Sequence, residues 1–253
     1  MIKINIIGSG NVAKAFALQL YKKVEIVSVY SRNYENALGL ADKVKAFAYN
    51  DLEELNFDVD LNIIAVKDDA IEDIVKCLPN NISVVHTSGS VGIESLNKFD
   101  EFGILYPYQT FTSGRIIDMA NIPFFLEANT TSFKNELNDF CLKNFSAQIY
   151  EANSEKRKHI HLAAVITSNF TNHLLFEAEK ILSEVGYPID ILKPLLLETI
   201  EKAISMGPKK AQTGPAKRND VKVMSNQINS IDSKELKIVY ELMSKLIIDV
   251  KKD

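Results

Sequence analysis

The sequence has only two cysteines, no long apolar run and no excess of basic residues. Cys77 and Cys141 lie far apart, in no spacing typical of metal ligands, so we expect a reduced compartment and no structural disulfide. No segment approaches the ~20 consecutive apolar residues of a membrane-spanning helix. The net charge of −4 argues against nucleic-acid binding, which usually needs a basic surface. We therefore expect a soluble, cytoplasmic protein with no nucleic-acid or membrane partner.

The hydrophobic pattern divides the chain near residue 153. Before this point, short β-branched runs alternate with helical patterns, which predicts a parallel sheet covered on both faces. We expect strands over residues 2–7, 24–30, 45–49, 61–66, 83–86, 103–106 and 124–127. After it, helices are expected over 154–185, 189–206, 219–229 and 233–250, separated by glycine–proline breaks. The sequence predicts an α/β, doubly wound, mostly parallel domain over 1–152 and an all-α domain over 153–253.

A glycine-rich loop follows the first predicted strand. Residues 8–13 read Gly-Ser-Gly-Asn-Val-Ala, a G-x-G-x-x-A pattern between an apolar strand and a helix. Gly8 permits a tight turn, Gly10 lets a pyrophosphate approach the backbone, and Ala13 keeps helix and strand close. The phosphates would lie at the helix N-terminus, where free N–H groups favour negative charge. The loop predicts a Rossmann domain that binds a dinucleotide through Gly8, Ser9, Gly10, Asn11 and Val12.

The end of the second strand distinguishes between the two nicotinamide dinucleotides. NAD sites place an acidic residue about 20 residues after the glycine loop, where it holds the ribose hydroxyls. This chain has Ser31, Arg32 and Asn33 there, and no acid before Glu35. The arginine can hold a 2′-phosphate by paired N–H contacts, and its neighbours can add hydrogen bonds. We therefore predict NADP(H); the alternative is a solvated arginine in a turn.

Two further strand ends are expected at the same crevice, because ligands of such sheets bind beyond the carboxyl ends of the strands. Val66 and Lys67 follow one strand, and Ser88 follows another. Small residues there suit a ribose and a nicotinamide that pass over the backbone. We predict cofactor contacts from these three residues; the alternative for Lys67 is that it begins the next helix.

Several segments together carry a family resemblance: the glycine loop and residues 31–32, 65–71, 86–90, 106–111, 161–169 and 213–220. They resemble Rossmann-like proteins with a DUF2520 C-terminal domain, over essentially the whole chain. That family is similar, more distantly, to 6-phosphogluconate dehydrogenase, β-hydroxyacid dehydrogenases, pyrroline-5-carboxylate reductase and F420-dependent NADP reductases. The resemblance implies a Rossmann domain, a helical domain that dimerises, and a substrate held between the two.

One departure from this wider group concerns catalysis. β-Hydroxyacid dehydrogenases place a catalytic lysine four residues before an asparagine on the interdomain helix. Asn169 is present here, but the residue four positions earlier is Val165. A lysine-based mechanism is therefore not carried over to this chain.

A polar stripe on the first long helix supplies the candidate catalytic residues. At 100° per residue, Ser168 lies within ~20° of His161 on the helix face, and Asn169 lies about 80° round, on the same side. Hydride transfer to a carbonyl or imine needs a proton donor, and we predict that His161 is this donor. The alternative is a core histidine bonded to a neighbouring carbonyl.

His86 is the second candidate acid. It lies at the carboxyl end of a predicted strand, and histidine titrates near neutral pH. A structural role for His86 is the alternative. Tyr106 and Tyr108 follow the next strand. We favour their interpretation as an aromatic wall of the site; the alternative is that their hydroxyls reach into it.

A basic loop in the helical domain is the predicted substrate-binding element. Lys209 and Arg218 are the candidates, in a cluster of four basic residues within an acidic protein. An arginine can clamp a carboxylate or phosphate bidentately, which favours an anionic metabolite. The alternatives for this segment are a solvated loop and a helix N-cap at Asn219 or Asp220.

Three functions follow from these observations. The first is an NADP(H)-dependent oxidoreductase that transfers a hydride to or from a small, anionic metabolite, acting as a homodimer through its C-terminal helices. The second is a non-catalytic dinucleotide-binding sensor or assembly protein, which the missing lysine favours. The third is a structural dimerisation protein, which leaves the glycine loop unexplained. We favour the first, because the polar helix stripe and the basic loop both suit a reaction site.

Overall fold

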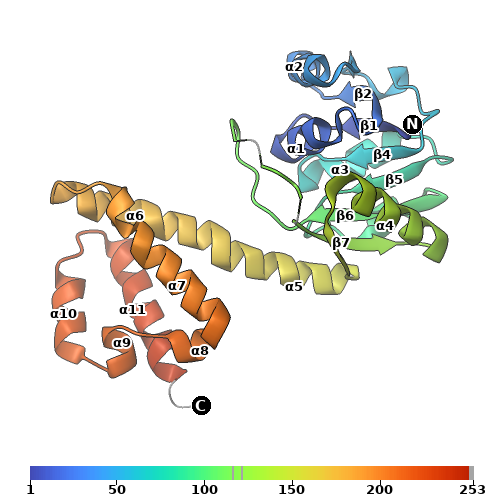
Figure 1. The fold of residues 1–253 in the computed structure, drawn as a ribbon. Helices are drawn as coiled ribbons and strands as arrows, with labels where there is room; N and C mark the ends of the chain where they lie inside the picture. The colour runs from blue at the N-terminus through green and yellow to red at the C-terminus, as the bar shows by residue number, and fades with distance from the viewer. Residues whose placement is uncertain (116, 121, 251–253) are drawn as a thin grey trace. The chain divides into compact units, whose positions relative to one another are not determined.

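The structure is a computed structural model that describes residues 1–115, 117–120 and 122–250, and it divides into two compact units, Met1–Asn169 and Phe170–Asp253 (Figure 1). The first unit is built on an eight-stranded sheet in the order β3-β2-β1-β4-β5-β6-β7-β8. All neighbouring strands are parallel except β6 and β7. The strands are β1 (Lys3–Ile7), β2 (Glu25–Tyr30), β3 (Phe47–Tyr49), β4 (Leu61–Ile64), β5 (Ser83–His86), β6 (Glu101–Pro107), β7 (Pro123–Ala128) and β8 (Gln148–Glu151).

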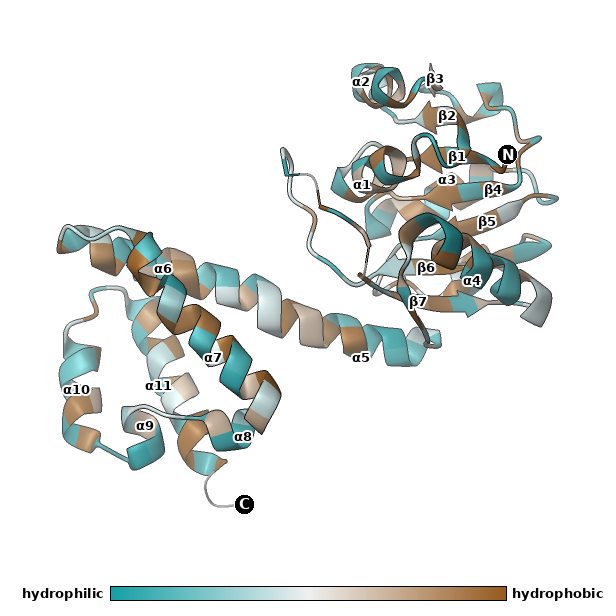
Figure 2. Ribbon diagram, in the orientation of Figure 1, coloured by the Kyte–Doolittle hydropathy of each residue, from teal (hydrophilic) through white to brown (hydrophobic). Residues whose placement is uncertain are grey.

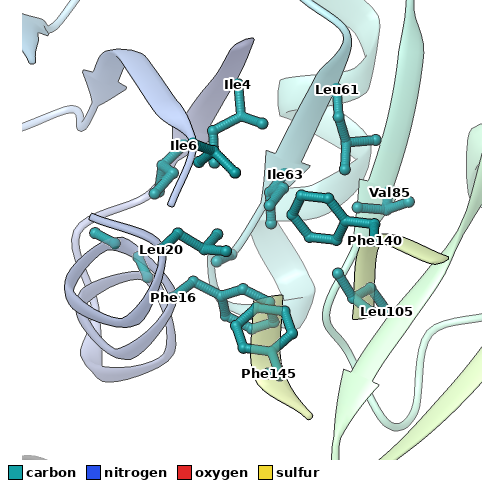
Figure 3. Close-up of a cluster of buried hydrophobic side chains, with 14 of the residues drawn as sticks. Ile4, Ile6, Phe16, Leu20, Leu61, Ile63, Val85, Leu105, Phe140 and Phe145 are labelled. Atoms are coloured by element: carbon teal, nitrogen blue, oxygen red, sulfur yellow. The ribbon is translucent and has the colours of Figure 1, made fainter. Parts of the chain in front are cut away.

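Helices cover both faces of this sheet. They are α1 (Asn11–Leu20), α2 (Tyr34–Val44), α3 (Ile71–Cys77) and α4 (Thr131–Phe145); α5 (Ser154–Ala164) follows β8 and contributes to neither buried cluster. Ile4 and Ile6 of β1 pack with α1, α2 and α4 in one buried cluster, which includes Phe16 and Phe140 (Figure 3), whereas Ile7 packs with α3 in a second cluster. Burial of each such side chain contributes about 1.5–3 kcal/mol. The predicted doubly wound, mostly parallel α/β fold is confirmed.

The strand order creates a crevice at one point of the sheet. From β1 the chain first adds β2 and β3 on one side, and then β4, β5 and β6 on the other. The loops that leave β1 and β4 therefore diverge at the carboxyl ends of two adjacent strands, which is where such sheets bind their ligands. The glycine loop follows β1 directly at this point.

The second unit is entirely helical within the described residues. Its helices are α6 (Phe170–Glu184), α7 (Lys193–Met206), α8 (Pro208–Ala211), α9 (Pro215–Arg218), α10 (Val221–Asn229) and α11 (Lys234–Asp249). Gly186 and Gly207 follow α6 and α7, and Gly214 precedes α9; their positive φ angles of 79°, 87° and 105° favour glycine. The all-α character predicted for this half is confirmed. None of the described helices is long and apolar enough to cross a membrane.

The prediction of one continuous α-helix over 154–185 is wrong in its middle. α5 ends at Ala164, and residues Val165–Asn169 form a π-helical turn before α6 begins. A π-turn adds one residue to a helical turn, so it shifts the face on which later residues lie by roughly 100°. Such turns are frequent at functional sites.

Candidate functional site

The glycine loop has the geometry that a bound pyrophosphate requires. Gly8 has φ +133°, and a Cβ added there would lie 2.2 Å from the carbonyl oxygen of Ala65, so only glycine fits. A Cβ added to Gly10 would meet nothing within 4 Å, which leaves its backbone open. Gly10 is the N-cap of α1, and no side chain caps this helix end or places an acid in its first turn. The free N–H groups therefore form a site for an anion.

A cavity of about 840 Å³ opens beside this loop, at the crevice of the sheet. Its volume is that of a ligand site for a small organic molecule. Nine of the eleven residues predicted to bind the cofactor line it: Gly8, Ser9, Gly10, Asn11, Val12, Ser31, Arg32, Val66 and Lys67. The residues present thus fit a dinucleotide, and the sequence pattern alone located most of the lining.

Arg32 is placed at the rim of this cavity with its guanidinium exposed. No carboxylate among the described residues forms an ion pair with it. Asp73 lines the same cavity, but its carboxylate is bound to Lys76 at 2.8 Å. The Ser31 hydroxyl accepts a hydrogen bond from that of Ser9, 2.8 Å away. An arginine without an ion-pair partner among the described residues thus lines the same cavity as two serine hydroxyls, a combination that is suited to a phosphate.

The two remaining cofactor candidates have other tasks in the fold. Asn33 is the N-cap of α2, where its side chain accepts a hydrogen bond from the backbone N–H of Asn36. Ser88 is buried, and its Oγ accepts hydrogen bonds from the backbone N–H groups of Ser90 and Val91. Both residues shape loops that adjoin the cavity, and neither lines it.

A second, smaller cavity of about 220 Å³ contains the predicted catalytic stripe. Its lining consists of Tyr106, Tyr108, Gln109, Thr110, His161, Ala164, Val165, Thr167, Ser168 and Asn169. Thr110 lines this cavity and the next residue, Phe111, lines the dinucleotide cavity, so one loop contributes to both cavities. The structure therefore brings His161, Ser168 and Asn169 to one site. The π-turn, which the sequence analysis did not foresee, carries Ser168 and Asn169.

The centre of the second cavity is a hydrogen-bonded pair, Tyr106 and His161. The Tyr106 hydroxyl lies 2.9 Å from Nδ1 of His161, and the two rings meet edge to face. Burial, together with the neighbouring Tyr108, raises the pKa of Tyr106 to about 12, so its hydroxyl stays protonated. Because a protonated hydroxyl can donate or accept, Tyr106 can pair with Nδ1 in both the neutral and the protonated ring, and Nε2 carries the N–H that is left for a substrate.

Gly89 packs against both rings of the Tyr106–His161 pair. A Cβ added at Gly89 would lie 2.6 Å from Nδ1 of His161 and 2.8 Å from Cζ of Tyr106. The loop that follows β5 therefore presses directly on both rings. The Tyr106 hydroxyl is bonded to the candidate donor, so the alternative to the favoured aromatic wall holds for this residue. Gly89 lies in the segment 86–90 noted in the sequence, but it was not assigned a role.

His86 is placed differently from His161. It is fully buried, its Nδ1 accepts a hydrogen bond from the N–H of Ser88 at 3.2 Å, and its Nε2 faces the carbonyl oxygen of Gly92 at 3.4 Å. Burial, reinforced by the charge of Arg157, lowers the pKa of His86 to about 4. A neutral ring with both nitrogens engaged supports the loop, and we leave His86 out of the proposed proton donors.

The candidate substrate residues lie in the second unit. Lys209 belongs to α8 and Arg218 ends α9; both are exposed, and neither has an ion-pair partner among the residues described. Asp220 is the N-cap of α10, where it accepts a hydrogen bond from Val223 N–H. Asn219 adopts the left-handed conformation that ends α9. The N-cap alternative is therefore correct for Asp220.

Comparison with known proteins decides the family. One family profile, "NADP oxidoreductase coenzyme F420-dependent", matches residues 3–87, and a second, "Domain of unknown function (DUF2520)", matches residues 122–247. The chain is similar to the crystal structure of a proposed NADP oxidoreductase from Bacteroides fragilis. The match covers 98% of this chain and 98% of that chain, with 38% sequence identity and a TM-score of 0.89. The chain belongs to this family of NADP oxidoreductases. No curated protein matches the sequence.

More distant structures share the fold of this oxidoreductase. A protein from Thermotoga maritima is 24% identical, with 98% of each chain covered and a TM-score of 0.71. The 1-pyrroline-5-carboxylate reductase of Streptococcus pyogenes is 15% identical, with 100% of this chain and 99% of that chain covered and a TM-score of 0.68. The predicted family is confirmed, and the predicted cofactor, NADP(H), is the dinucleotide for which the family is named.

Proposed function

We propose that this oxidoreductase transfers a hydride between NADP(H) and a small, anionic metabolite that contains a carbonyl or imine group. The observation that carries the proposal is the Tyr106–His161 pair, which lines a cavity that shares the loop of Thr110 and Phe111 with the dinucleotide cavity. A proton donor beside a nicotinamide site is the arrangement that carbonyl or imine reduction needs. It also replaces the lysine that is absent at Val165.

In the first unit, one set of residues binds the cofactor and another set protonates and orients the substrate. NADPH, when bound, supplies the hydride. The glycine loop and the N-terminus of α1 hold the pyrophosphate, and Arg32 holds the 2′-phosphate. The protonated His161 ring donates its Nε2 proton to the oxygen or nitrogen of the substrate and becomes neutral. Its Nδ1–H then donates to the Tyr106 oxygen, and solvent returns the proton to Nε2. Ser168 and Asn169 add hydrogen bonds that orient the substrate.

The anionic character of the substrate rests on the second unit. Lys209 and Arg218 carry exposed charges without ion-pair partners among the described residues, whereas the cavity around His161 has no basic side chain other than that histidine. We therefore assign an anion-binding role to these two residues of the second unit.

The proposed function is tested by a panel of small 2-oxo acids and cyclic imino acids, including pyrroline-5-carboxylate. Purified protein and NADPH are mixed with each compound, and the loss of NADPH absorbance is followed. At least one member should be reduced, with NADPH preferred over NADH. The corresponding uncharged amides should be poor substrates. If no compound is reduced although NADPH binds, the non-catalytic sensor becomes the better account.

Replacing Arg32 by alanine should weaken NADPH binding about 10- to 100-fold and leave NADH binding nearly unchanged. The reason is that only NADPH carries the 2′-phosphate, and a charged hydrogen-bonded contact to it contributes about 1.5–3 kcal/mol. Calorimetric titration of both dinucleotides measures the effect. Lys14→Ala is the matched control, because Lys14 is a nearby base outside the dinucleotide cavity. Equal affinities for the two dinucleotides in the wild type would contradict the assignment.

The second unit should form a homodimer. Most large apolar side chains that are exposed in a single chain lie from Leu162 onward, and Figure 2 shows hydrophobic residues along α6 and α7. Sedimentation at micromolar concentration should give about twice the chain mass of 28.4 kDa. Ile204→Lys, on α7, should produce a monomer, whereas Phe47→Lys, on β3 of the first unit, should not. A monomeric wild type would contradict the dimer.

A further inference from the structure

A buried ionic cluster lies at the start of α5, away from both cavities. Arg157 is fully buried; its Nη1 donates to Glu127 of β7 at 2.5 Å, and its Nη2 donates to the carbonyl oxygen of Val91 at 2.5 Å. Nη2 also lies 3.2 Å from Oγ of Ser154. One guanidinium therefore joins three segments: a strand, a helix start and the loop after β5.

Ser154 provides a second contact between α5 and the loop after β5. Its Oγ donates to Glu127 at 2.7 Å and accepts a hydrogen bond from the backbone N–H of Ile93 at 2.9 Å. Val91 and Ile93 belong to the loop that carries Gly89 against the rings of Tyr106 and His161. The loop is thus held by α5 at two backbone positions, just beyond its contact with the candidate donor.

Stability alone is a poor explanation for this cluster. A buried ion pair seldom improves on apolar residues of similar volume, because removing both charges from water costs about as much as their attraction returns. The Nε–H of Arg157 moreover has no hydrogen-bond partner, which is a further cost of about 1–3 kcal/mol. What an arginine offers here is its planar fork, which holds several acceptors in fixed directions.

The geometry points to Arg157 as a positioning residue for the Tyr106–His161 pair, an inference that rests on the proposed function. Arg157 and His161 are four residues apart on α5 and so lie on the same helix face. By joining this face to β7 and to the loop of Gly89, Arg157 sets the distance between the His161 ring and the Tyr106 hydroxyl. Arg157 itself contacts neither cavity.

The test separates positioning from stability with two variants. Arg157→Met combined with Glu127→Leu removes both charges and keeps similar volumes, so the fold should retain most of its stability. Arg157→Lys keeps a charge for Glu127 but cannot also reach Val91 in the same geometry. For each variant we measure the melting temperature, NADPH affinity, the ¹⁵N chemical shifts of the His161 ring nitrogens, assigned with His161→Gln, and turnover of the reduced substrate.

The double variant should stay folded, with a melting temperature lowered by the lost bonds to Val91 and Ser154, and it should bind NADPH within about threefold. Its His161 Nδ1 shift should nevertheless move towards that of a nitrogen without a hydrogen bond. Turnover should fall about 10²-fold, as expected when a reacting group is displaced by ~1 Å. For Arg157→Lys, both the His161 Nδ1 shift and the turnover should lie between those of the wild type and the double variant. Unchanged ring shifts and turnover in a folded variant would overturn the inference; if the double variant does not fold, the lysine variant decides in the same way. The ring shifts need no substrate, so they test the positioning role even if the proposed reaction is wrong.

Discussion

Replacing His161 by alanine should lower turnover about 10²–10⁴-fold and leave NADPH affinity nearly unchanged, as expected for the loss of a positioned acid. His161 lines the small cavity with Ser168 and Asn169, and it does not line the dinucleotide cavity. The hydride donor would therefore still bind, but the developing charge on the substrate would lack a proton. Steady-state kinetics with the substrate from the panel, and calorimetric titration of NADPH, measure the two quantities.

The chain offers a matched control on the same helix. His159 lies two residues earlier, is exposed, and its Nδ1 contacts the carbonyl oxygen of Glu155 within α5. His159→Ala should leave turnover within about twofold of the wild type. Tyr106→Phe should give a smaller loss than His161→Ala, about tenfold, because it removes the hydrogen bond that holds the ring but not the proton donor. If His161→Ala kept full turnover, the substrate would receive its proton from another group.

The dinucleotide half of the site could be predicted because its signal is local. The strand, the glycine loop and the helix are contiguous in sequence, and Arg32 follows at the next strand end, so spacing alone located these residues. The prediction was weaker where a nearby backbone group could bind the side chain in place of the cofactor. The side chain of Asn33 caps α2, and that of Ser88 bonds its own loop, because short polar side chains readily bond the backbone next to them.

The catalytic half depends on contacts between distant segments. Tyr106, Gly89 and His161 come from three different elements, and a periodicity argument reaches only the third. The π-turn at Val165–Asn169 is invisible to a calculation at 100° per residue, because nothing in Val-Ile-Thr-Ser-Asn distinguishes it from an α-helix. The buried Arg157 reads as an ordinary surface charge among Glu155, Lys156 and Lys158.

The strands of the sheet that were predicted are those rich in β-branched and apolar residues. β1, β4 and β5 are buried over most of their length and were recognised within two residues at either end. α4 and β8 were not assigned. β8 is largely exposed at the edge of the sheet, and α4 buries only one face, so neither presents a continuous apolar run. That β7 runs antiparallel to β6 depends on a long connection, which periodicity does not describe.

Lowering the pH from 7 to 4 should destabilise the first unit by about 3 kcal/mol through His86 alone. Burial and the charge of Arg157 lower its pKa from 6.5 to about 4 in the folded protein. Between these two values the unfolded chain binds a proton that the folded chain does not, so the free energy of unfolding falls as the pH falls. The stabilisation is complete above pH 6.5 and is lost progressively down to about pH 4.

Urea unfolding at pH 7, 5.5 and 4 measures this effect, followed by circular dichroism because the chain has no tryptophan. Other groups titrate in the same range, so the decisive quantity is the difference from a variant without the imidazole. His86→Gln keeps an amide donor towards the Gly92 carbonyl, and it should be less stable than the wild type at pH 7 but should lose much less stability between pH 7 and 4. Equal losses in the two proteins would mean that His86 titrates normally, and hence that its ring is not held neutral beside Arg157.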